Sequence, residues 1–221
     1  MKNYVKLLAI TVAVFAVNSV KAQDTGFKYG SRFGIGSASF VSDGNNSFKS
    51  KLLLQAGIAS SYMFSKNVGL MADVLFTSKG SKNSGVTTEN TFGVTTEYPY
   101  SETYNFYYAE IPFMGRIQFG TPEIGFKVYA GPSYNFKLAA TETRKYDNES
   151  YNNNNGYEAK EIEDLDVAET ALVVGGGIDV YSNGGIYFID VRYSRGTNYF
   201  RLFNNSEAFT SYFSINIGQL F

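Results

Sequence analysis

FTSYFSINIGQLF, residues 209–221, is the stretch that decides the fold. Alternate positions carry Phe209, Phe213, Ile215, Ile217 and Phe221, and the positions between them are mostly polar or small. Side chains of a strand point alternately to its two faces, so this segment predicts a strand with one oily face and one polar face. An apolar outward face and an aromatic residue at the C-terminus are typical of the closing strand of a transmembrane β-barrel.

The same alternation recurs along the chain and predicts eight strands. Their ranges are 27–40, 52–64, 68–77, 104–119, 124–140, 167–181, 186–195 and 209–221. Short and long connections alternate between them, as in bacterial outer-membrane barrels, which have short periplasmic turns and long extracellular loops. We therefore expect an all-β fold: an eight-stranded antiparallel up-and-down transmembrane barrel with both termini in the periplasm.

Four long connections are expected to be external loops, and the two longest are one after residue 77 and one over residues 141–166. The second carries eight acidic against three basic residues and an asparagine run. Its composition predicts a solvated, mobile, acidic loop.

The N-terminus has the features of an export signal. Lys2 and Lys6 precede an apolar run, and Val20-Lys21-Ala22 offers a small-residue cleavage site. We expect residues 1–22 to be a signal peptide and residues 23–221 to form one outer-membrane barrel domain. No later stretch offers the roughly 18 to 20 consecutive apolar residues of a spanning helix, so insertion must use strands.

The amino-acid composition limits the reactions and partners that are possible for this chain. The chain has no Cys and no His, which excludes disulfides, thiol nucleophiles and imidazole-based catalysis. Removing the signal peptide would take three lysines and move the net charge from −1 to −4, which argues against nucleic acid as a partner. We expect no enzyme activity, no metal and no cofactor.

Charged residues at inward positions are the candidate site. Eight strands enclose just enough space for side chains, so these charges should plug the lumen as a paired network. The set has four bases and four acids, with the glutamate somewhat higher than the rest: Arg32, Asp73, Glu110, Arg116, Lys127, Asp179, Asp190 and Arg192. The alternative is a gated path for protons or ions.

Aromatic residues gather around the start of the fourth strand: Tyr98, Tyr100, Tyr104, Phe106, Tyr107 and Tyr108. We interpret them as an aromatic girdle at the outer membrane interface together with projecting strand ends. The alternative is a patch that binds a glycan or a protein, because clustered tyrosine is good contact material.

Two short motifs point to a family. Tyr108-Ala109-Glu110-Ile111-Pro112 within a long strand, followed by Ala130-Gly131-Pro132 in the next, resembles the PorT-like outer-membrane β-barrel family of Bacteroidota. The resemblance implies a small eight-stranded barrel of OmpA/OmpX type, and the namesake serves a protein-secretion apparatus. We expect Pro112 to lie at a β-bulge, where a missing ladder hydrogen bond is best tolerated.

These observations favour a small, plugged outer-membrane barrel with a structural or interaction role carried by its external loops. Two other classes stay open: a narrow or gated pore, and a soluble periplasmic barrel of lipocalin type with its apolar residues inside. The expected partners are outer-membrane lipid, the β-barrel assembly machinery through the strand ending at Phe221, and a protein or glycan at the external loops. The chain is expected to be a monomer.

Overall fold

The structure is a computed structural model that describes residues 25–42, 48–162, 168–182, 185–197, 200–201 and 207–221. The expected signal peptide, residues 1–22, lies outside these ranges. Among the described residues, no helix is both long enough and apolar enough to cross a membrane.

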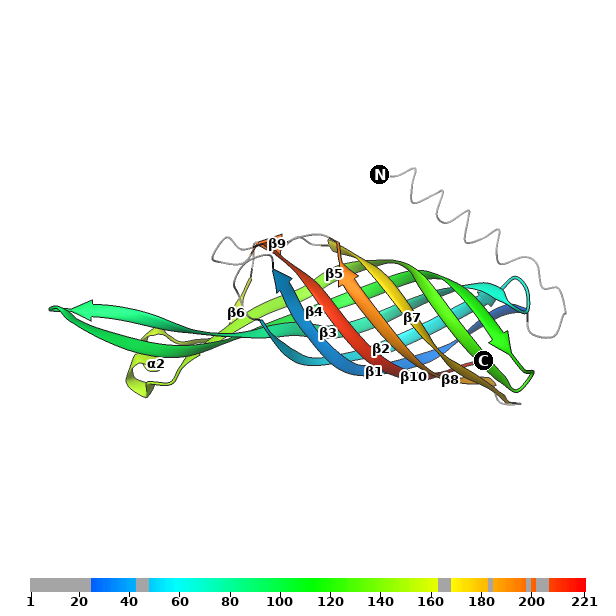
Figure 1. Cartoon of the computed structure of the whole chain (residues 1–221), viewed down its shortest axis with the longest axis horizontal. Helices are drawn as coiled ribbons and strands as arrows, with labels where there is room; N and C mark the ends of the chain where they lie inside the picture. The colour runs from blue at the N-terminus through cyan, green and yellow to red at the C-terminus, as the bar shows by residue number, and fades with distance from the viewer. Residues whose placement is uncertain (1–24, 43–47, 163–167, 183–184, 198–199, 202–206) are drawn as a thin grey trace.

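Eight antiparallel strands close into a ring (Figure 1). They are β1 (Gly26–Ser42), β2 (Lys49–Met63), β3 (Val68–Thr91), β4 (Val94–Gly120), β5 (Ile124–Tyr146), β7 (Ala168–Ser182), β8 (Gly185–Gly196) and β10 (Glu207–Leu220). Each strand pairs with its neighbour along the chain, and β10 pairs with β1 to close the barrel. The short strands β6 (Tyr157–Glu161) and β9 (Phe200–Arg201) pair with β5 and β10 outside the ring. The predicted fold class is confirmed.

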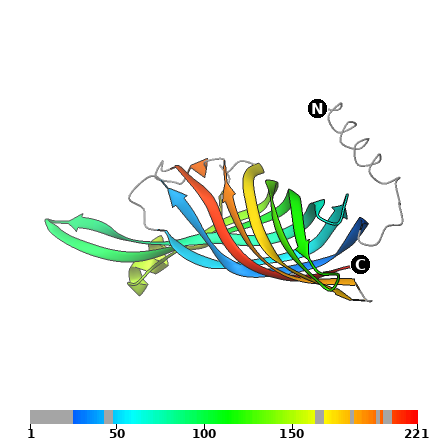
Figure 2. The same cartoon turned by 45° about the vertical axis from the view of Figure 1, so that its right-hand side comes forward.

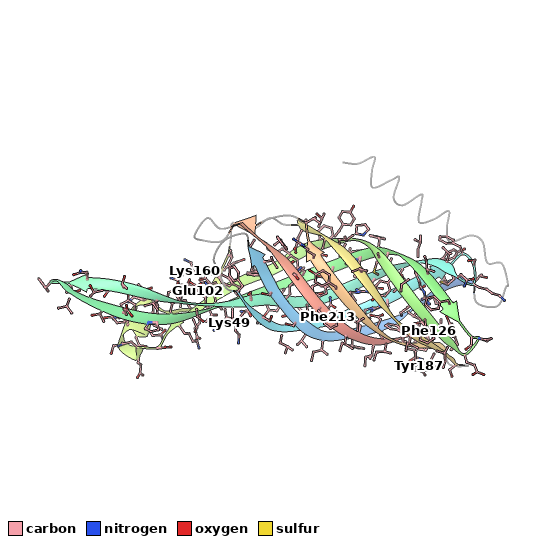
Figure 3. All side chains as sticks on the ribbon, viewed as in Figure 1. Lys49, Glu102, Phe126, Lys160, Tyr187 and Phe213 are labelled. Atoms are coloured by element: carbon pink, nitrogen blue, oxygen red, sulfur yellow. The ribbon has the colours of Figure 1, made fainter. Side chains whose placement is uncertain are left out.

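Apolar side chains cover the outside of the barrel. In Figure 3, Phe126, Tyr187 and Phe213 lie on its outer surface, and all three are about half exposed. The same holds for Val128 and Ile189, so the soluble lipocalin-type alternative, which needs these residues inside, is wrong. A broad apolar exterior in contact with hydrocarbon removes the need for a conventional core.

Phe209 is an exception to the predicted outward face of the last strand. It is buried, and the guanidinium of Arg195 lies 4.3 Å from the centre of its ring. A side chain covered by a charged group cannot contact acyl chains, so the lipid-facing part of β10 begins at Phe213.

The long connection after residue 77 is not a loop. β3 continues to Thr91 and β4 begins at Val94, and the two strands stay paired up to the Thr91–Val94 pair. Figures 1 and 2 show this ribbon projecting far beyond the rest of the barrel. Phe92 and Gly93 form its turn with φ of 53° and 82°. Positive φ at both central residues is the signature of a type I′ hairpin turn.

The acidic connection over residues 141–166 also contains regular structure. β5 continues to Tyr146, and the helix α2 (Glu149–Asn155) and strand β6 follow. Asn148 caps the helix, because its side-chain oxygen accepts a hydrogen bond from the backbone N–H of Tyr151 at 3.0 Å. The predicted loop therefore contains regular secondary structure over its described residues, and its mobility stays a prediction.

Glycines on the inner wall make room for large lumen side chains. A Cβ on Gly175 would lie 2.5 Å from the ring of Tyr129, and one on Gly218 would lie 2.3 Å from Phe188. Both rings lie against the wall where the glycines stand, which explains why a strand interior tolerates them.

Pro112 does not lie at a bulge. The register of β4 against β5 shifts between Tyr107 and Tyr108, four residues away from the proline, and Pro112 itself pairs with Ser133.

Candidate functional site: the lumen and its outer mouth

Seven of the eight predicted lumen residues form one continuous chain of ion pairs. Arg116 pairs with Asp179, which pairs with Lys127 at 2.8 Å, and Lys127 lies 3.4 Å from Asp190. Asp190 pairs with Arg32 at 2.8 Å, Arg32 with Asp73 at 3.2 Å, and Asp73 with Arg192 at 2.8 Å. Every member is at most 2% exposed. We call this group the lower network, and it carries four bases against three acids.

The chain of pairs crosses the barrel because its members come from different walls. Arg32 on β1 reaches Asp190 on β8, and Arg116 on β4 reaches Asp179 on β7. Neighbouring strands bring in Asp73 from β3 and Lys127 from β5. Five of the six ion pairs therefore link strands that do not share a hydrogen-bond ladder, and only the Lys127–Asp179 pair joins adjacent strands, β5 and β7. The network braces the ring from within.

Neutral groups complete the lower network. Asp190 accepts hydrogen bonds from the phenol of Tyr129 at 2.9 Å and from the amide of Asn216 at 3.1 Å. The ring of Phe188 lies 4.6 Å from the guanidinium of Arg32 and 4.2 Å from the ammonium of Lys127. A cation over an aromatic face is stabilised by the ring quadrupole, which matters most where water is absent.

The eighth predicted residue, Glu110, belongs to a second cluster. It lies 3.4 Å from Lys79, which also pairs with Glu169 at 2.9 Å. Gln55 and Tyr212 donate hydrogen bonds to Glu110 at 3.1 and 2.9 Å. We call Lys79, Glu110 and Glu169 the upper network. Its one base and two acids offset the surplus base of the lower network, so the two together are neutral.

Lys79 and Glu169 were missed by the sequence reasoning. The predicted third strand ends at Thr77, two residues before Lys79. Glu169 lies near the start of the predicted sixth strand, 167–181, which corresponds to β7. The signal was present in the alternation itself, since Asp73, Thr77 and Lys79 occupy the same side of β3.

An aromatic cluster lies beyond the upper network. Tyr104, Phe106 and Tyr108 of β4 are at most 4% exposed. They pack with Phe40, Ala140, Ile162 and Ala208 into one buried cluster. These three residues are therefore part of the lumen filling, and their predicted place in an outer aromatic girdle is wrong. Tyr107, which faces the other side of β4, stacks on Phe76.

A third charged group lies at the outer mouth, where the ribbon leaves the barrel. Figure 3 labels Glu102 and Lys160 in this region. Arg144 pairs with Glu102, and its guanidinium lies 3.7 Å from Glu142. The phenols of Tyr104 and Tyr157 donate hydrogen bonds to Glu102 and Glu142 respectively.

The carboxyl group of Glu142 has a raised pKa. Burial, together with the nearby carboxylate of Glu102, raises the pKa of Glu142 above its ordinary value, although Tyr157, Arg144 and Lys160 oppose the shift. The mouth thus holds two close carboxylates against one arginine, and protonating Glu142 relieves their repulsion.

The arrangement of the lumen side chains is suited to closing the barrel. Within the described residues no group of three or more His, Cys, Asp or Glu side chains could hold a metal ion. The lumen charges are paired with one another at successive levels, and the aromatic cluster lies between them and the outer mouth. These are the features of a plug.

Comparison with known proteins agrees with this architecture. The sequence profile described as outer membrane protein beta-barrel domain matches residues 21–200. The chain belongs to this family. The membership places it in the outer membrane as a small β-barrel protein. No curated protein matches the chain in sequence.

Several solved structures have similar folds. The Neisserial surface protein A has 14% identity over 89% of this chain and 98% of its own, with a TM-score of 0.46. OprG from Pseudomonas aeruginosa has 12% identity over 90% of this chain and 97% of its own, with a TM-score of 0.46. Ail of Yersinia pestis, solved in complex with the heparin analogue sucrose octasulfate, has 12% identity over 89% and 99%, with a TM-score of 0.42.

Proposed function

We propose that this protein is a closed outer-membrane barrel whose task is to hold the β3–β4 ribbon stiffly outside the cell as a contact element. The observation that carries the proposal is the continuity of β3 and β4. They run for 24 and 27 residues, whereas the other strands of the ring have 12 to 23. Crossing the bilayer takes only about 9 to 11 residues.

The ribbon reaches well away from the barrel. The last β3 residue that pairs with β2 is Lys82, and nine further residues lead to Thr91. At about 3.3 Å per residue these nine span roughly 30 Å. In the described part of the chain, no other strand pairs with residues 83–91 or 94–99.

Contacts from the connection that follows β5 stiffen the outer half of the ribbon. The ring of Tyr151 in α2 stacks on Tyr98 of β4 with centres 3.7 Å apart, and its phenol donates a hydrogen bond to Glu89 of β3 at 3.2 Å. Tyr146 packs edge-on against Tyr151. An isolated two-stranded hairpin is marginal in water, so this aromatic support is what a projecting ribbon needs.

Two measurements test the proposal, one for the closed lumen and one for the exposed ribbon. In planar bilayers the purified protein should give no steady channel openings, because paired charges fill the lumen. On intact cells, added protease should cleave within residues 84–101 and leave the membrane-embedded barrel whole. Regular conductance steps, or a ribbon protected from protease on cells with no surface cover, would contradict the proposal.

A second candidate role comes from the resemblance to PorT-like barrels. It is supported by the place of the two motifs, since Pro112 pairs with Ser133 beside Pro132 on adjacent strands. A Cβ on Gly131 would lie 1.9 Å from the carbonyl oxygen of Phe113, so the motifs form one closely packed wall segment. An accessory role in an outer-membrane secretion apparatus predicts that deleting the gene changes the set of secreted proteins. An unchanged set would rule it out.

A further inference from the structure

The tip of the ribbon is unusual in two independent ways. Phe92 has a relative exposure of 103%, so its whole ring faces solvent. Its φ of 53° lies in the left-handed region, which bulky residues avoid and which Asn or Gly would occupy with less strain. Keeping a phenylalanine here is unfavourable both for the turn and for solvation, which points to a contact made by its side chain.

The residues around Phe92 form an uncharged cap. Residues 90–96 contain no charged side chain, and Val94 is also well exposed. Asn90 accepts a hydrogen bond from the backbone N–H of Gly93 at 3.1 Å. The turn therefore satisfies one of its own polar groups internally, which lowers the penalty for leaving water.

Two carboxylates limit how deep this cap can go. The chain repeats Gly-Val-Thr-Thr-Glu at 85–89 and 93–97, on the two sides of the turn. The register pairs Glu89 with Thr96 and Thr88 with Glu97, so the two glutamates lie on opposite faces of the ribbon. Together they form an acidic collar about three residues, or roughly 10 Å, behind the tip.

We propose that the tip, centred on Phe92, inserts into the interfacial layer of an opposing lipid membrane. The inference rests on the proposed function, because it needs the ribbon to project from the cell. An uncharged cap of roughly 10 Å matches the 5 to 10 Å by which interfacial segments enter a bilayer. The acidic collar stays in the headgroup region and favours a zwitterionic surface over an anionic one.

The shape of the tip favours lipid over a protein pocket. A stable protein interface buries about 800 Å² on each partner, whereas the tip offers only the side chains of Phe92 and Val94 as exposed apolar surface. A fluid bilayer has no shape to match, so one aromatic ring suffices for weak binding. Many barrels in one outer membrane then act together, and their combined avidity holds two membranes in contact.

The experiment uses a feature of the composition. The chain has no Trp, so Phe92→Trp places a single fluorophore at the tip. Proteoliposomes carrying many copies are mixed with zwitterionic vesicles whose phosphatidylcholine has brominated acyl chains. We expect the emission of the Phe92→Trp protein to shift to the blue and to be quenched. The matched control, Val86→Trp, lies behind the collar on the same ribbon and should stay unquenched.

Vesicle docking is measured in parallel for two substitutions of Phe92. They separate an effect on the folding of the turn from the loss of the side-chain contact with lipid. Phe92→Asn suits the left-handed turn but removes the ring, and it should lower vesicle docking at least fivefold. Phe92→Leu should keep most of it. Docking that is unchanged in Phe92→Asn, or equal quenching at positions 86 and 92, would overturn the inference.

Two further outcomes separate the inference from the proposed function. If protease on intact cells cleaves the ribbon but the Phe92→Trp protein is not quenched by vesicles, the lipid site is wrong and the projecting ribbon stands. If the fluorescence responds to a soluble protein and not to vesicles, the tip belongs to a protein pocket and the lipid site is again wrong. If protease on intact cells does not reach the ribbon, both the lipid site and the proposed function of the ribbon are wrong.

Discussion

At the scale of single residues, the stability of the barrel depends on buried charged side chains. These side chains are paired with one another and are shielded from solvent. Arg192 is 1% exposed and pairs with Asp73, whereas Arg195 on the same strand faces outward. Removing the sole partner of a buried charge typically costs about 3 to 5 kcal/mol, and the cost is smaller where a second partner remains, as Arg32 does for Asp73.

We therefore expect Arg192→Ala to lower the free energy of unfolding by about 1 to 3 kcal/mol, because buried Asp73 loses one of its two arginine partners and keeps Arg32. Arg195→Ala, the control on the outer face, removes the cation–π contact with Phe209 and should lower the free energy of unfolding by about 0.5 to 1 kcal/mol. Urea unfolding in lipid vesicles, and the temperature at which gel mobility changes, measure the difference. Equal stability of the two variants would show that the lower network does not brace the barrel.

The outer mouth should depend on pH through Glu142. Because its pKa in the folded protein is raised above the unfolded value, the stabilisation linked to its protonated form is present below about pH 4.5 and is lost as pH rises through the raised pKa. The pairing of β5 with β6 should therefore loosen as pH rises above that window.

Hydrogen exchange of the β6 amides, corrected for the intrinsic pH dependence, measures this. Glu142→Gln should remove the extra pH dependence and protect β6 at neutral pH, since its amide oxygen can still accept the hydrogen bond from Tyr157. The same pH dependence in the wild type and in Glu142→Gln would show that another group controls the mouth.

At the scale of elements, α2 is the support of the ribbon. Helices of seven residues are not stable by themselves, so α2 depends on its cap at Asn148 and on the stack of Tyr151 with Tyr98. The dependence is mutual, because the ribbon lacks a third strand over residues 83–91 in the described structure.

Tyr151→Ala should therefore loosen the ribbon without affecting the barrel. It removes a stacked pair worth about 0.5 to 1.5 kcal/mol beyond its buried area. We expect faster amide exchange over residues 86–97 and unchanged heat-dependent gel mobility. Ser150→Ala, on the exposed side of the same helix, is the control and should change neither. A ribbon that exchanges equally in both variants would mean that it is stable alone.

At the scale of the whole molecule, the barrel and the ribbon are separable. The ring closes through β1 and β10, and among the residues that the structure describes none of the cross-barrel ion pairs involves residues 84–101. Insertion into the outer membrane should then depend on the ring alone.

Replacing residues 84–101 by Asn-Gly joins Asn83 to Glu102 through a favoured hairpin turn. We expect the shortened protein to reach the outer membrane in normal amount and to keep its heat-dependent gel mobility, because the lumen is unchanged. Vesicle docking should be lost. Retention of the shortened protein in the periplasm would show that the ribbon takes part in assembly.

The amino-acid sequence alone determined the ring of strands and the face on which each charge lies. Both follow from a period of two, which is a local property: Val128 and Lys127 are neighbours in the chain and must point to opposite sides. The alternation predicts the third strand only as far as residue 77, where its apolar face ends, although β3 continues to Thr91. Residues 78–91 are rich in Ser, Thr, Asn and Gly, and a ribbon in water needs no oily side, so a strand there looks like a loop.

Only the tertiary structure decided which charges meet. Glu110 was grouped with Arg116 and Asp179, yet it pairs with Lys79, because the stagger between neighbouring strands sets the height of each side chain in the barrel. The stacking of Tyr151 on Tyr98 likewise joins residues 53 positions apart. Such contacts depend on the register of paired strands and on the path of the chain in space, and a pattern read along one strand contains neither.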